Sequence, residues 1–331
     1  MTSRASDFRH EPVLPAECLT WLQVKPEGTY VDCTVGGAGH SSLILSALGK
    51  GGRLIGLDKD DDALDATRPR LAALLAGNAS GATFDLVKSD FSHLDEALDS
   101  IGVDKVDGIL ADLGVSSYQL DEAGRGFGYM QDGPLDMRMD RTAPLTAATV
   151  VNTYPRADIE RILFEFGEER FSARIASAIV ETRAKAPFES TAALAETIRR
   201  AIPAAMRREG PHPAKRSFQA IRIEVNGELS ALDRLLVIAP ARLAPGGRLC
   251  VISFHSLEDR RVKDAFKRLE KPCICPKDLP RCHCGKISAG RAMTRQPIEA
   301  GDMEKEHNPR SRSAKLRVFE TNRGQGAGAD V

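Results

Sequence analysis

The sequence lacks any long hydrophobic run, and this absence narrows the class of protein. No stretch approaches ~18 uninterrupted apolar residues, the length that a transmembrane helix needs. The first residues, MTSRASDFRHEPVL, also lack the apolar core of a secretory signal peptide. We therefore expect a cytoplasmic protein. Apolar residues make up 42% and charged residues 28%, as in ordinary globular proteins, and 331 residues suffice for one large or two medium domains.

The chain also lacks a net charge, so composition alone indicates no partner. The distribution of charge is uneven. Between positions 199 and 222, seven cations face a single acid, Glu209; the cations are Arg199, Arg200, Arg207, Arg208, Lys215, Arg216 and Arg222. Two further basic stretches read DRRVKDAFKRLEK and NPRSRSAKLR. Such runs indicate either a solvated face or contact with nucleic-acid phosphates.

Cysteine is sparse and divides into two groups. Cys18, Cys33 and Cys250 lie in apolar surroundings, where buried thiols are expected. The other four follow the spacing C-x-C-x6-C-x-C, in a compartment that disfavours disulfides; they are Cys273, Cys275, Cys282 and Cys284. This group has enough thiols for a tetrahedral zinc site, and reactive or merely loop-borne thiols are the alternative. The pattern alone assigns no metal ligand.

Strand-like and helix-like patterns alternate over the first third of the chain, which predicts a parallel sheet covered on both faces. The spacing becomes helical from about 145 to 208, and strand patterns return at GGRLCVISF and AKLRVFE. We predict a doubly wound α/β domain (1–117 with 214–322), split by a mainly helical insertion (118–213) and followed by a disordered tail (323–331). A tandem of two domains is the alternative, but it leaves short sheets without cover.

A glycine-rich loop follows the first predicted strand, in YVDCTVGGAGHSSLIL. Gly36, Gly37 and Gly39 allow a sharp turn toward a ligand, and Asp58 ends the next strand, where an acid accepts hydrogen bonds from ribose hydroxyls. The dinucleotide fingerprint needs a third glycine where Ser42 stands, and the P-loop lysine is absent. The loop therefore favours a nucleoside cofactor, with a structural strand-to-helix turn as the alternative.

An acid also ends the fourth predicted strand, VDGILADLG, beside the point where ligands bind in open sheets. This residue, Asp112, stands where amino-methyltransferases place a polar group beside the reactive methyl. The methyl donor S-adenosyl-L-methionine has a ribose but no pyrophosphate, which relaxes the demand for the third glycine. A nicotinamide dehydrogenase and a non-catalytic RNA-binding factor are the competing classes. The missing glycine and Asp112 disfavour the first, and the intact loop disfavours the second.

Longer motifs carry a resemblance to a known family. They include HEPVLPAECL, GGAGHS, DGILADLGVSSYQLDEAGRGFGYMQDGPLDMRMD, GEERFSARIASAIV, FQAIRIEVNGEL, APGGRLCVISFHSLEDRRVK and NPRSRSAKLRV. In this order, from about His10 to Glu320, the chain closely resembles the bacterial RsmH (MraW) family. The resemblance implies a class I methyltransferase (Rossmann-like) fold with an inserted helical domain that recognises RNA. It further implies methylation of the exocyclic N4 of one cytidine in the decoding region of 16S ribosomal RNA, within the small subunit, and a homodimer is possible.

The resemblance also implies site residues. The donor would be bound by Gly37, Ala38, Gly39, His40, Asp58, Phe91, Asp112 and Gln119. Ala38 stands where the family usually has glycine, and Tyr118 where it often has proline. Asp112 would be catalytic by accepting a hydrogen bond from the cytosine N4, or would only bind the donor's amino group. Phe127, Tyr129 and Met130 would stack on an extruded base or pack within the insertion.

Overall fold

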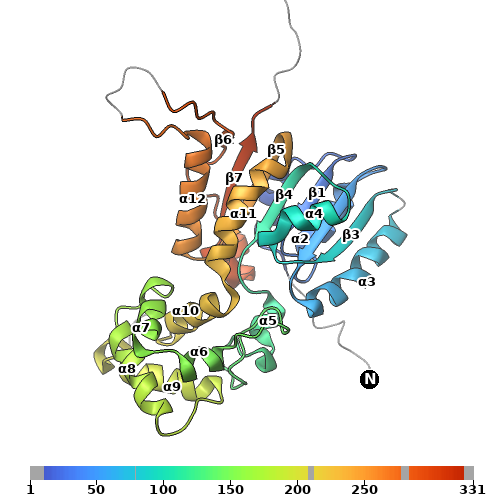
Figure 1. Cartoon of the computed structure of the whole chain (residues 1–331). Coiled ribbons are helices and arrows are strands. Elements are labelled where there is room, and N and C mark those ends of the chain that lie inside the picture. The colour runs from blue at the N-terminus through green and yellow to red at the C-terminus, as the bar shows by residue number, and fades with distance from the viewer. Residues whose placement is uncertain (1–10, 79, 208–211, 277–282, 324–331) are drawn as a thin grey trace, which may run out of the picture. The chain divides into compact units, whose positions relative to one another are not determined.

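A computed structural model describes residues 11–78, 80–207, 212–276 and 283–323 of the chain (Figure 1). The chain forms two compact units, which are described separately. The first consists of Met1–Gly114 and Ser230–Val331, and the second of Val115–Leu229. In the described part of the chain, every helix is too short or too polar to cross a bilayer.

The first unit is built on a seven-stranded sheet with the order β3-β2-β1-β4-β5-β7-β6. The first five strands in this order are parallel, and β7 runs antiparallel to both β5 and β6. The strands are β1 (Thr29–Asp32), β2 (Arg53–Asp58), β3 (Thr83–Lys88), β4 (Val106–Asp112), β5 (Leu243–Ser253), β6 (Gly290–Ala292) and β7 (Lys315–Thr321). The doubly wound sheet is confirmed, but it is mixed rather than parallel throughout. The sequence did not reveal β6, because three residues are too few to show an alternation.

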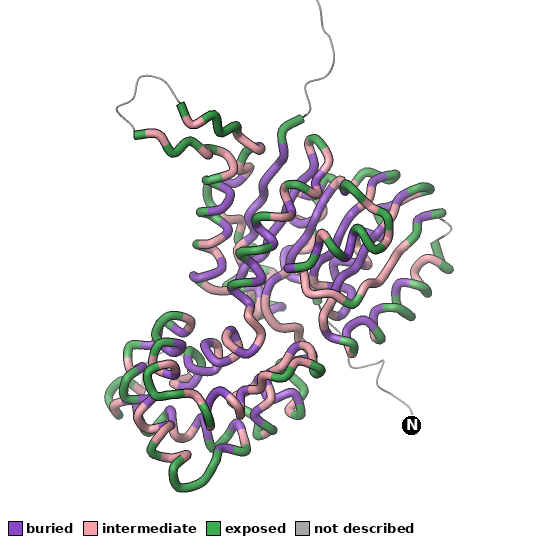
Figure 2. The backbone as a smooth tube through the Cα atoms, viewed as in Figure 1, coloured by how far each residue is buried: buried purple, intermediate pink, exposed green. Residues whose placement is uncertain are grey.

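Helices cover both faces of this sheet, as its near-continuous apolar strands require. Successive strand residues point to opposite faces. Val31, Ile55 and Ile109 pack with α4 (Leu94–Ser100), α11 (Glu228–Arg242) and α12 (Ser256–Glu270). Their neighbours Tyr30, Leu54 and Leu110 pack on the other face with α1 (Pro15–Leu22), α2 (Gly39–Ala47) and α3 (Asp61–Gly77). The sheet is accordingly the most deeply buried layer of the unit (Figure 2). Short elements η1 (Phe91–His93), α13 (Asp302–His307) and η4 (Pro309–Ser313) complete the unit.

The three cysteines in apolar surroundings confirm their predicted burial. The exposed fractions of Cys18, Cys33 and Cys250 are 1%, 2% and 0%. Burial raises the pKa of all three thiols, so they remain protonated and unreactive.

The second unit is helical, as the spacing predicted. Its helices are α5 (Ser117–Asp121), η2 (Ala123–Arg125), α6 (Ala147–Thr153), α7 (Arg156–Glu165), α8 (Ser172–Arg183), α9 (Thr191–Ala201), η3 (Ala204–Arg207) and α10 (Lys215–Asn226). The apolar faces of α6, α7, α8, α9 and α10 share one core with Leu135 and Met137 from the segment before α6. The core therefore includes Leu135 and Met137 from a glycine-rich segment whose sequence shows no hydrophobic periodicity.

The second unit extends over 115–229, whereas the insertion was predicted at 118–213. The difference lies at the carboxyl end. Phe218, Ile221 and Val225 on α10 are buried in the helical core, so α10 belongs to the second unit and the chain returns to the sheet with α11. Both helices are amphipathic, so periodicity alone did not tell them apart. The predicted tail falls almost wholly on 324–331, outside the described residues.

A buried ion pair links β5 to β7. Arg248 lies opposite Glu320 in the antiparallel register, and its guanidinium donates two hydrogen bonds to Glu320 Oε2, at 3.0 and 2.7 Å. A third hydrogen bond, 2.8 Å long, reaches the carbonyl of Trp21 at the end of α1. The side chains of Arg248 and Glu320 are only 7% and 4% exposed. The pair thus ties the antiparallel part of the sheet to its parallel part and to the first helix.

Candidate active site

Three acids gather where β1, β4 and β5 end in the first unit. Asp32 and Asp112 are the last residues of β1 and β4, and Glu258 lies in the first turn of α12, just after β5. Because the carboxyl ends of parallel strands meet at one edge of a sheet, these residues share the usual location of ligand sites in such folds.

Asp32 fixes the start of the glycine-rich loop. Its Oδ2 accepts a 2.6 Å hydrogen bond from the Ser41 hydroxyl, and its Oδ1 accepts one of 3.1 Å from the Thr34 backbone N–H. The side chain is 1% exposed. Burial raises the pKa of Asp32, although these hydrogen bonds oppose the rise. Asp32 therefore positions the loop that joins β1 to α2.

Asp112 is placed differently, because part of its carboxyl group has no partner. Its backbone N–H donates to the Thr34 hydroxyl at 2.8 Å, and its Oδ2 lies 3.7 Å from His40 Nε2. Its Oδ1 is buried and accepts no hydrogen bond from any residue that the structure describes. Burial, and then the negative charges of Asp32 and Glu258, raise the pKa of Asp112 well above its usual range. A buried acceptor left in this way fits a ligand that brings a hydrogen-bond donor or a positive charge.

Glu258 supplies the third acidic group, and the sequence analysis did not single it out. Its Oε2 accepts hydrogen bonds from the backbone N–H groups of Phe254, at 2.8 Å, and His255, at 3.3 Å. His255 Nε2 lies 3.2 Å from Glu258 Oε1, and the acid is 2% exposed. The available signal was the glutamate three residues after the helix cap in HSLE, the spacing of a capping box.

The glycine-rich loop is held by Asp58. The backbone N–H groups of Gly36 and Asp60 donate to the two carboxylate oxygens of Asp58, each at 2.9 Å. Burial raises the pKa of Asp58 to about 6, against the effect of these two bonds. Thr67 adds a 3.1 Å hydrogen bond to the Gly36 carbonyl. Asp58 thus shapes the loop, and each of its oxygens keeps a second lone pair that a ribose hydroxyl can use.

The remaining predicted donor-binding residues lie in the first unit, except for Gln119, which lies in the second. Gly39 and His40 open α2. A Cβ at Gly39 would lie 3.0 Å from the Pro12 ring, so a side chain there would have to displace the proline slightly. Phe91 follows β3 in η1, partly buried against the sheet core. Gln119 lies in the second unit, where its Oε1 accepts from the Ser116 N–H at 3.0 Å in a capping box. The structure brings the loop, His40, Asp58 and Asp112 together in the first unit, while the donor contact of Gln119 remains a prediction.

Ala38 adopts the left-handed conformation that glycine usually provides, with φ 63° and ψ 22° at the cap of α2. This conformation costs a non-glycine residue roughly 1–2 kcal/mol. The Ala38 methyl group is fully buried, which stabilises the folded protein by about 0.8 kcal/mol. Alanine also lowers the conformational entropy of the unfolded chain, which adds ~0.4–1 kcal/mol of stability. These terms nearly cancel, so alanine tolerates the position at little net cost.

We therefore expect Ala38→Gly to change the free energy of unfolding by less than ~1 kcal/mol. Ala38→Val should lower it by ~2 kcal/mol or more, because a β-branched side chain is strained at this φ and the site has no free volume. Urea denaturation of both variants measures the difference, with Ala73→Val on the exposed side of α3 as control. Equal effects of valine at positions 38 and 73 would contradict the strain.

Comparison with known proteins identifies the family of the chain. The model of the MraW methylase family matches residues 7–322. The chain belongs to the MraW methylase family. A relative from Symbiobacterium thermophilum is 54% identical over 94% of this chain and 96% of its own length. Relatives from Carboxydothermus hydrogenoformans and Clostridioides difficile are 53% and 51% identical, over 95% of this chain and 98% and 99% of their own. All three are named "Ribosomal RNA small subunit methyltransferase H".

Membership in the MraW family explains the architecture and the cofactor. In class I methyltransferases, the antiparallel strand β7 lies between β5 and β6 at one side of an otherwise parallel sheet. This chain has the same arrangement, so the predicted fold class is confirmed. S-adenosyl-L-methionine is the methyl donor of this MraW methylase, and the dehydrogenase alternative is excluded. The loop with its left-handed residues, the clamp by Asp58 and the open acceptor on Asp112 fit a nucleoside that carries positive charge.

Proposed function

We propose that this protein transfers a methyl group from S-adenosyl-L-methionine to the exocyclic N4 of a specific cytidine in the decoding region of 16S ribosomal RNA. The names of the relatives support ribosomal RNA of the small subunit as the substrate. The motifs shared with the RsmH family support cytidine N4 as the acceptor atom. The observation that carries the chemistry is the buried Asp112 Oδ1, which has no partner among the described residues.

The donor supplies an electrophilic methyl group, and the chain's own residues supply position and charge. The loop at Gly37–His40 and the Asp58 carboxylate of the first unit are proposed to bind the nucleoside, and Phe91 is proposed to contact its adenine. The predicted donor contact of Gln119, which lies in the second unit, remains a prediction. Holding the reacting groups together can lower the barrier by roughly 7–11 kcal/mol. Position is therefore the largest contribution that this site makes.

Asp112 is proposed as the catalytic residue. The cytosine N4 is a poor nucleophile, because its lone pair is delocalised into the ring. A carboxylate oxygen without a partner can accept a hydrogen bond from N4, turn the lone pair out of the ring and relieve positive charge as the new bond forms. The second candidate role is a contact with the donor's amino group. The two roles differ in what a neutral replacement of Asp112 would change.

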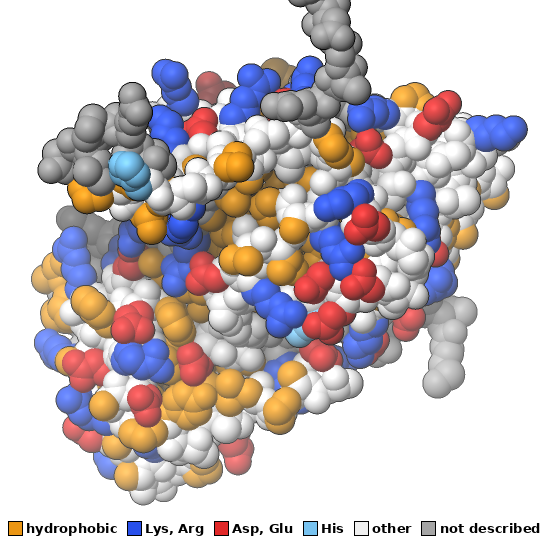
Figure 3. Space-filling view, turned by 45° about the horizontal axis from the view of Figure 1, so that its top comes forward, with side chains coloured by type: hydrophobic (Ala, Val, Ile, Leu, Met, Phe, Trp, Pro, Cys, Tyr) orange, Lys and Arg blue, Asp and Glu red, His pale blue; other side chains and the backbone are white. Residues whose placement is uncertain are grey.

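The cations of the second unit define the proposed RNA surface, and the structure revises the predicted set. Arg222 donates two 2.8 Å hydrogen bonds to Glu228 and is only 16% exposed, so its role is structural. Arg199 and Arg200 share Glu196, with contacts of 2.6 Å each. Arg208 and Glu209 lie outside the described residues. Figure 3 shows cationic and anionic side chains interspersed over the visible face rather than one broad basic field.

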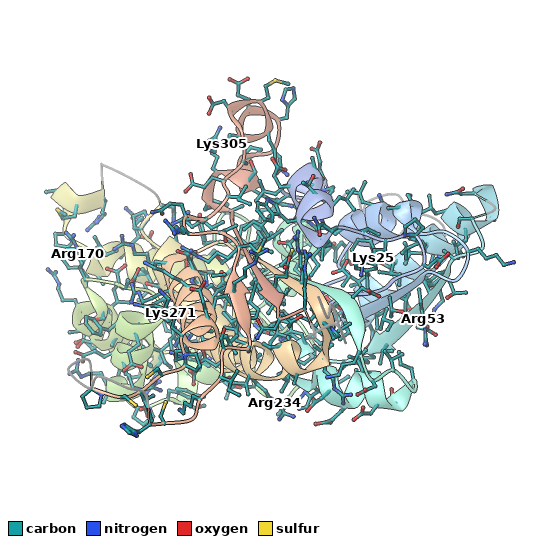
Figure 4. The ribbon with its side chains drawn as sticks, turned by 90° about the horizontal axis from the view of Figure 1, so that it is seen from above. Lys25, Arg53, Arg170, Arg234, Lys271 and Lys305 are labelled. Atoms are coloured by element: carbon teal, nitrogen blue, oxygen red, sulfur yellow. The ribbon has the colours of Figure 1, made fainter. Side chains whose placement is uncertain are left out.

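Two exposed cations lie at the start of α10. Lys215 and Arg216 are both exposed, and Arg216 donates a 3.2 Å hydrogen bond to the Glu168 carbonyl, two residues before the exposed Arg170. Arg170 projects from the second unit (Figure 4). We name Arg170, Lys215 and Arg216 the α10 basic cluster and propose that it contacts RNA phosphates.

The three predicted stacking residues have different environments. Phe127 is 5% exposed and packs within the helical core, which favours the packing alternative for this ring. Tyr129 stacks on His212 with ring centroids 4.7 Å apart and meets the edge of Phe218. Met130 is 77% exposed. Only Met130 remains fully available for contact with a base.

RNA binding tests the α10 basic cluster. Replacing Arg170 and Lys215 together by alanine should weaken RNA affinity, because two phosphate contacts are lost. The slope of log affinity against log salt should become shallower by about 1.4–1.8, at ~0.7–0.9 per phosphate. Fluorescence anisotropy with a 16S RNA fragment measures both, with Lys50→Ala in the first unit as control. An unchanged slope in the double variant would contradict phosphate contact by this cluster.

The proposed reaction is tested by incubating the protein with methyl-labelled donor and small ribosomal subunits that lack the modification, followed by nucleoside analysis of the RNA. We expect the label in N4-methylcytidine. Label in another nucleoside would overturn the acceptor assignment, and no label in either subunits or free 16S RNA would overturn the activity. Sedimentation of the same preparation tests the predicted homodimer.

A further inference from the structure

We propose that Cys273, Cys275 and Cys284 bind a zinc ion in the first unit, in the segment between α12 and β6. Their sulfur atoms all lie within 4.8 Å of one another. Zinc–thiolate bonds of ~2.3 Å in tetrahedral geometry place sulfur atoms about 3.8 Å apart, so these three side chains need only small adjustments to share one ion. The site is separate from the acids at the ends of β1, β4 and β5.

A backbone contact orients one sulfur atom of this cluster. The His283 N–H donates to Cys275 Sγ at 3.3 Å. Hydrogen bonds from groups around a metal site commonly orient its ligands. The contact also ties residue 283 to the start of the segment, which brings Cys284 toward the C-x-C pair.

The described residues of the same segment form no hydrophobic core of their own. None of 271–276 or 283–289 is buried, and Ile274 and Ile287 are 70% and 85% exposed. The segment begins at Lys271, which follows α12 (Figure 4). Its base is closed by a 2.9 Å hydrogen bond from the Ala289 N–H to the Leu269 carbonyl. A segment without a hydrophobic core of its own is the kind that a structural metal stabilises.

The chemistry of the cluster favours zinc over other metals. Soft thiolates select zinc, copper(I) or iron–sulfur clusters, and tetrahedral thiolate sites hold zinc or iron–sulfur. Methyl transfer involves no net oxidation or reduction, so the proposed function needs no redox metal. Zinc takes four ligands, and the three described cysteines supply three. Cys282, the remaining cysteine of the predicted group, lies outside the described residues.

The full-length protein, purified under reducing conditions from zinc-supplemented medium, tests the site by elemental analysis. We expect about one equivalent of zinc per chain in the wild type. Cys273→Ser, Cys275→Ser and Cys284→Ser should each lose most of it, whereas Cys18→Ala, which removes a buried thiol elsewhere, should retain it. Zinc absent from the wild type, zinc retained in all three serine variants, or an iron–sulfur chromophore would each overturn the proposal.

Two further measurements keep the test decisive if a variant fails to fold. Binding of the methyl donor reports an intact first unit, so zinc loss with donor binding preserved supports a local site. Cobalt(II) exchanged into the wild-type protein should give thiolate-to-cobalt charge-transfer absorption and the visible bands of a tetrahedral ion. Cobalt spectra without thiolate bands, or a disulfide between these cysteines after purification with reductant, would overturn it. None of these readouts depends on methylation of RNA.

Discussion

Asp112→Asn is expected to lower the maximal rate of methyl transfer by about 10²–10⁴ while changing the affinity for S-adenosyl-L-methionine by only a few-fold. Asparagine keeps the shape of the side chain, but its amide accepts a hydrogen bond less strongly than a carboxylate and cannot offset positive charge on the acceptor nitrogen. Single-turnover rates and equilibrium donor binding separate the two effects. Asp85→Asn, a partly exposed acid on β3, is the control.

Unchanged turnover with weakened donor binding would assign Asp112 to the donor's amino group instead. The pH dependence adds a second readout. The pKa of Asp112 is raised by burial and by the neighbouring charges of Asp32 and Glu258. The reactive form is the carboxylate, so the wild-type rate should rise as pH increases through this raised pKa. The Asp112→Asn variant should lack that rise.

The same variant should be more stable than the wild type at neutral pH. When the pKa of an acid is higher in the folded than in the unfolded state, the protein loses stability as the pH rises from the unfolded-state pKa to the folded-state pKa. Above that window, Asp112 places an unfavourable charge beside Asp32 and Glu258, and asparagine removes it. Thermal denaturation without donor measures the gain. Lower stability of Asp112→Asn at neutral pH would contradict the raised pKa.

Arg248→Met is expected to lower the free energy of unfolding by ~3–5 kcal/mol, because it leaves the Glu320 carboxylate buried without its main partner. Glu320 is 4% exposed, so water does not replace the two lost hydrogen bonds. The Trp21 carbonyl loses its donor as well. Urea denaturation at neutral pH measures the effect. The matched control is Lys88→Met, whose partner Asp61 is 58% exposed and whose loss should cost less than ~1 kcal/mol.

The cost of Arg248→Met should shrink in acid. Burial opposes ionisation of Glu320, but the hydrogen bonds and charge of Arg248 prevail and lower its pKa. The stabilisation by this pair is therefore present above the unfolded pKa of glutamate, about 4.3, and is lost as pH falls through the lower folded value. Equal losses for Arg248→Met and Lys88→Met at neutral pH would show that the buried pair contributes no more than an exposed one.

Much of the fold was predictable because buried parallel strands carry a strong apolar signal. β1, β2, β4 and β5 were visible as short apolar runs, and the amphipathic helices of the second unit showed their period. The boundary at α10 was not predictable, because an amphipathic helix does not reveal which core receives its apolar face. β6 is only three residues long, which is too short to show a pattern. The apolar pattern of its partner β7 does not reveal that this strand runs antiparallel to its neighbours.

The sequence identified site residues that end a strand. It did not identify roles that depend on contacts with residues far away in the chain. Asp58 and Asp112 were found because each closes an apolar run. That Asp58 clamps the loop through Gly36 and Asp60 depends on backbone geometry, which spacing does not show. Glu258 was missed because its effect on Asp112 acts through space, from a helix about 145 residues later in the chain. The left-handed Ala38 likewise required the structure.

The split of the first unit has a consequence for synthesis on the ribosome. β4 pairs with β5, yet the whole second unit is translated between them. At ~5–20 residues per second, the roughly 130 residues between β4 and β5 keep one edge of β4 unpaired for about 6–26 s after it emerges. An open edge of a buried strand invites pairing with other nascent chains. Cells that make this methylase quickly should therefore depend on chaperones during that interval, although the finished sheet needs none.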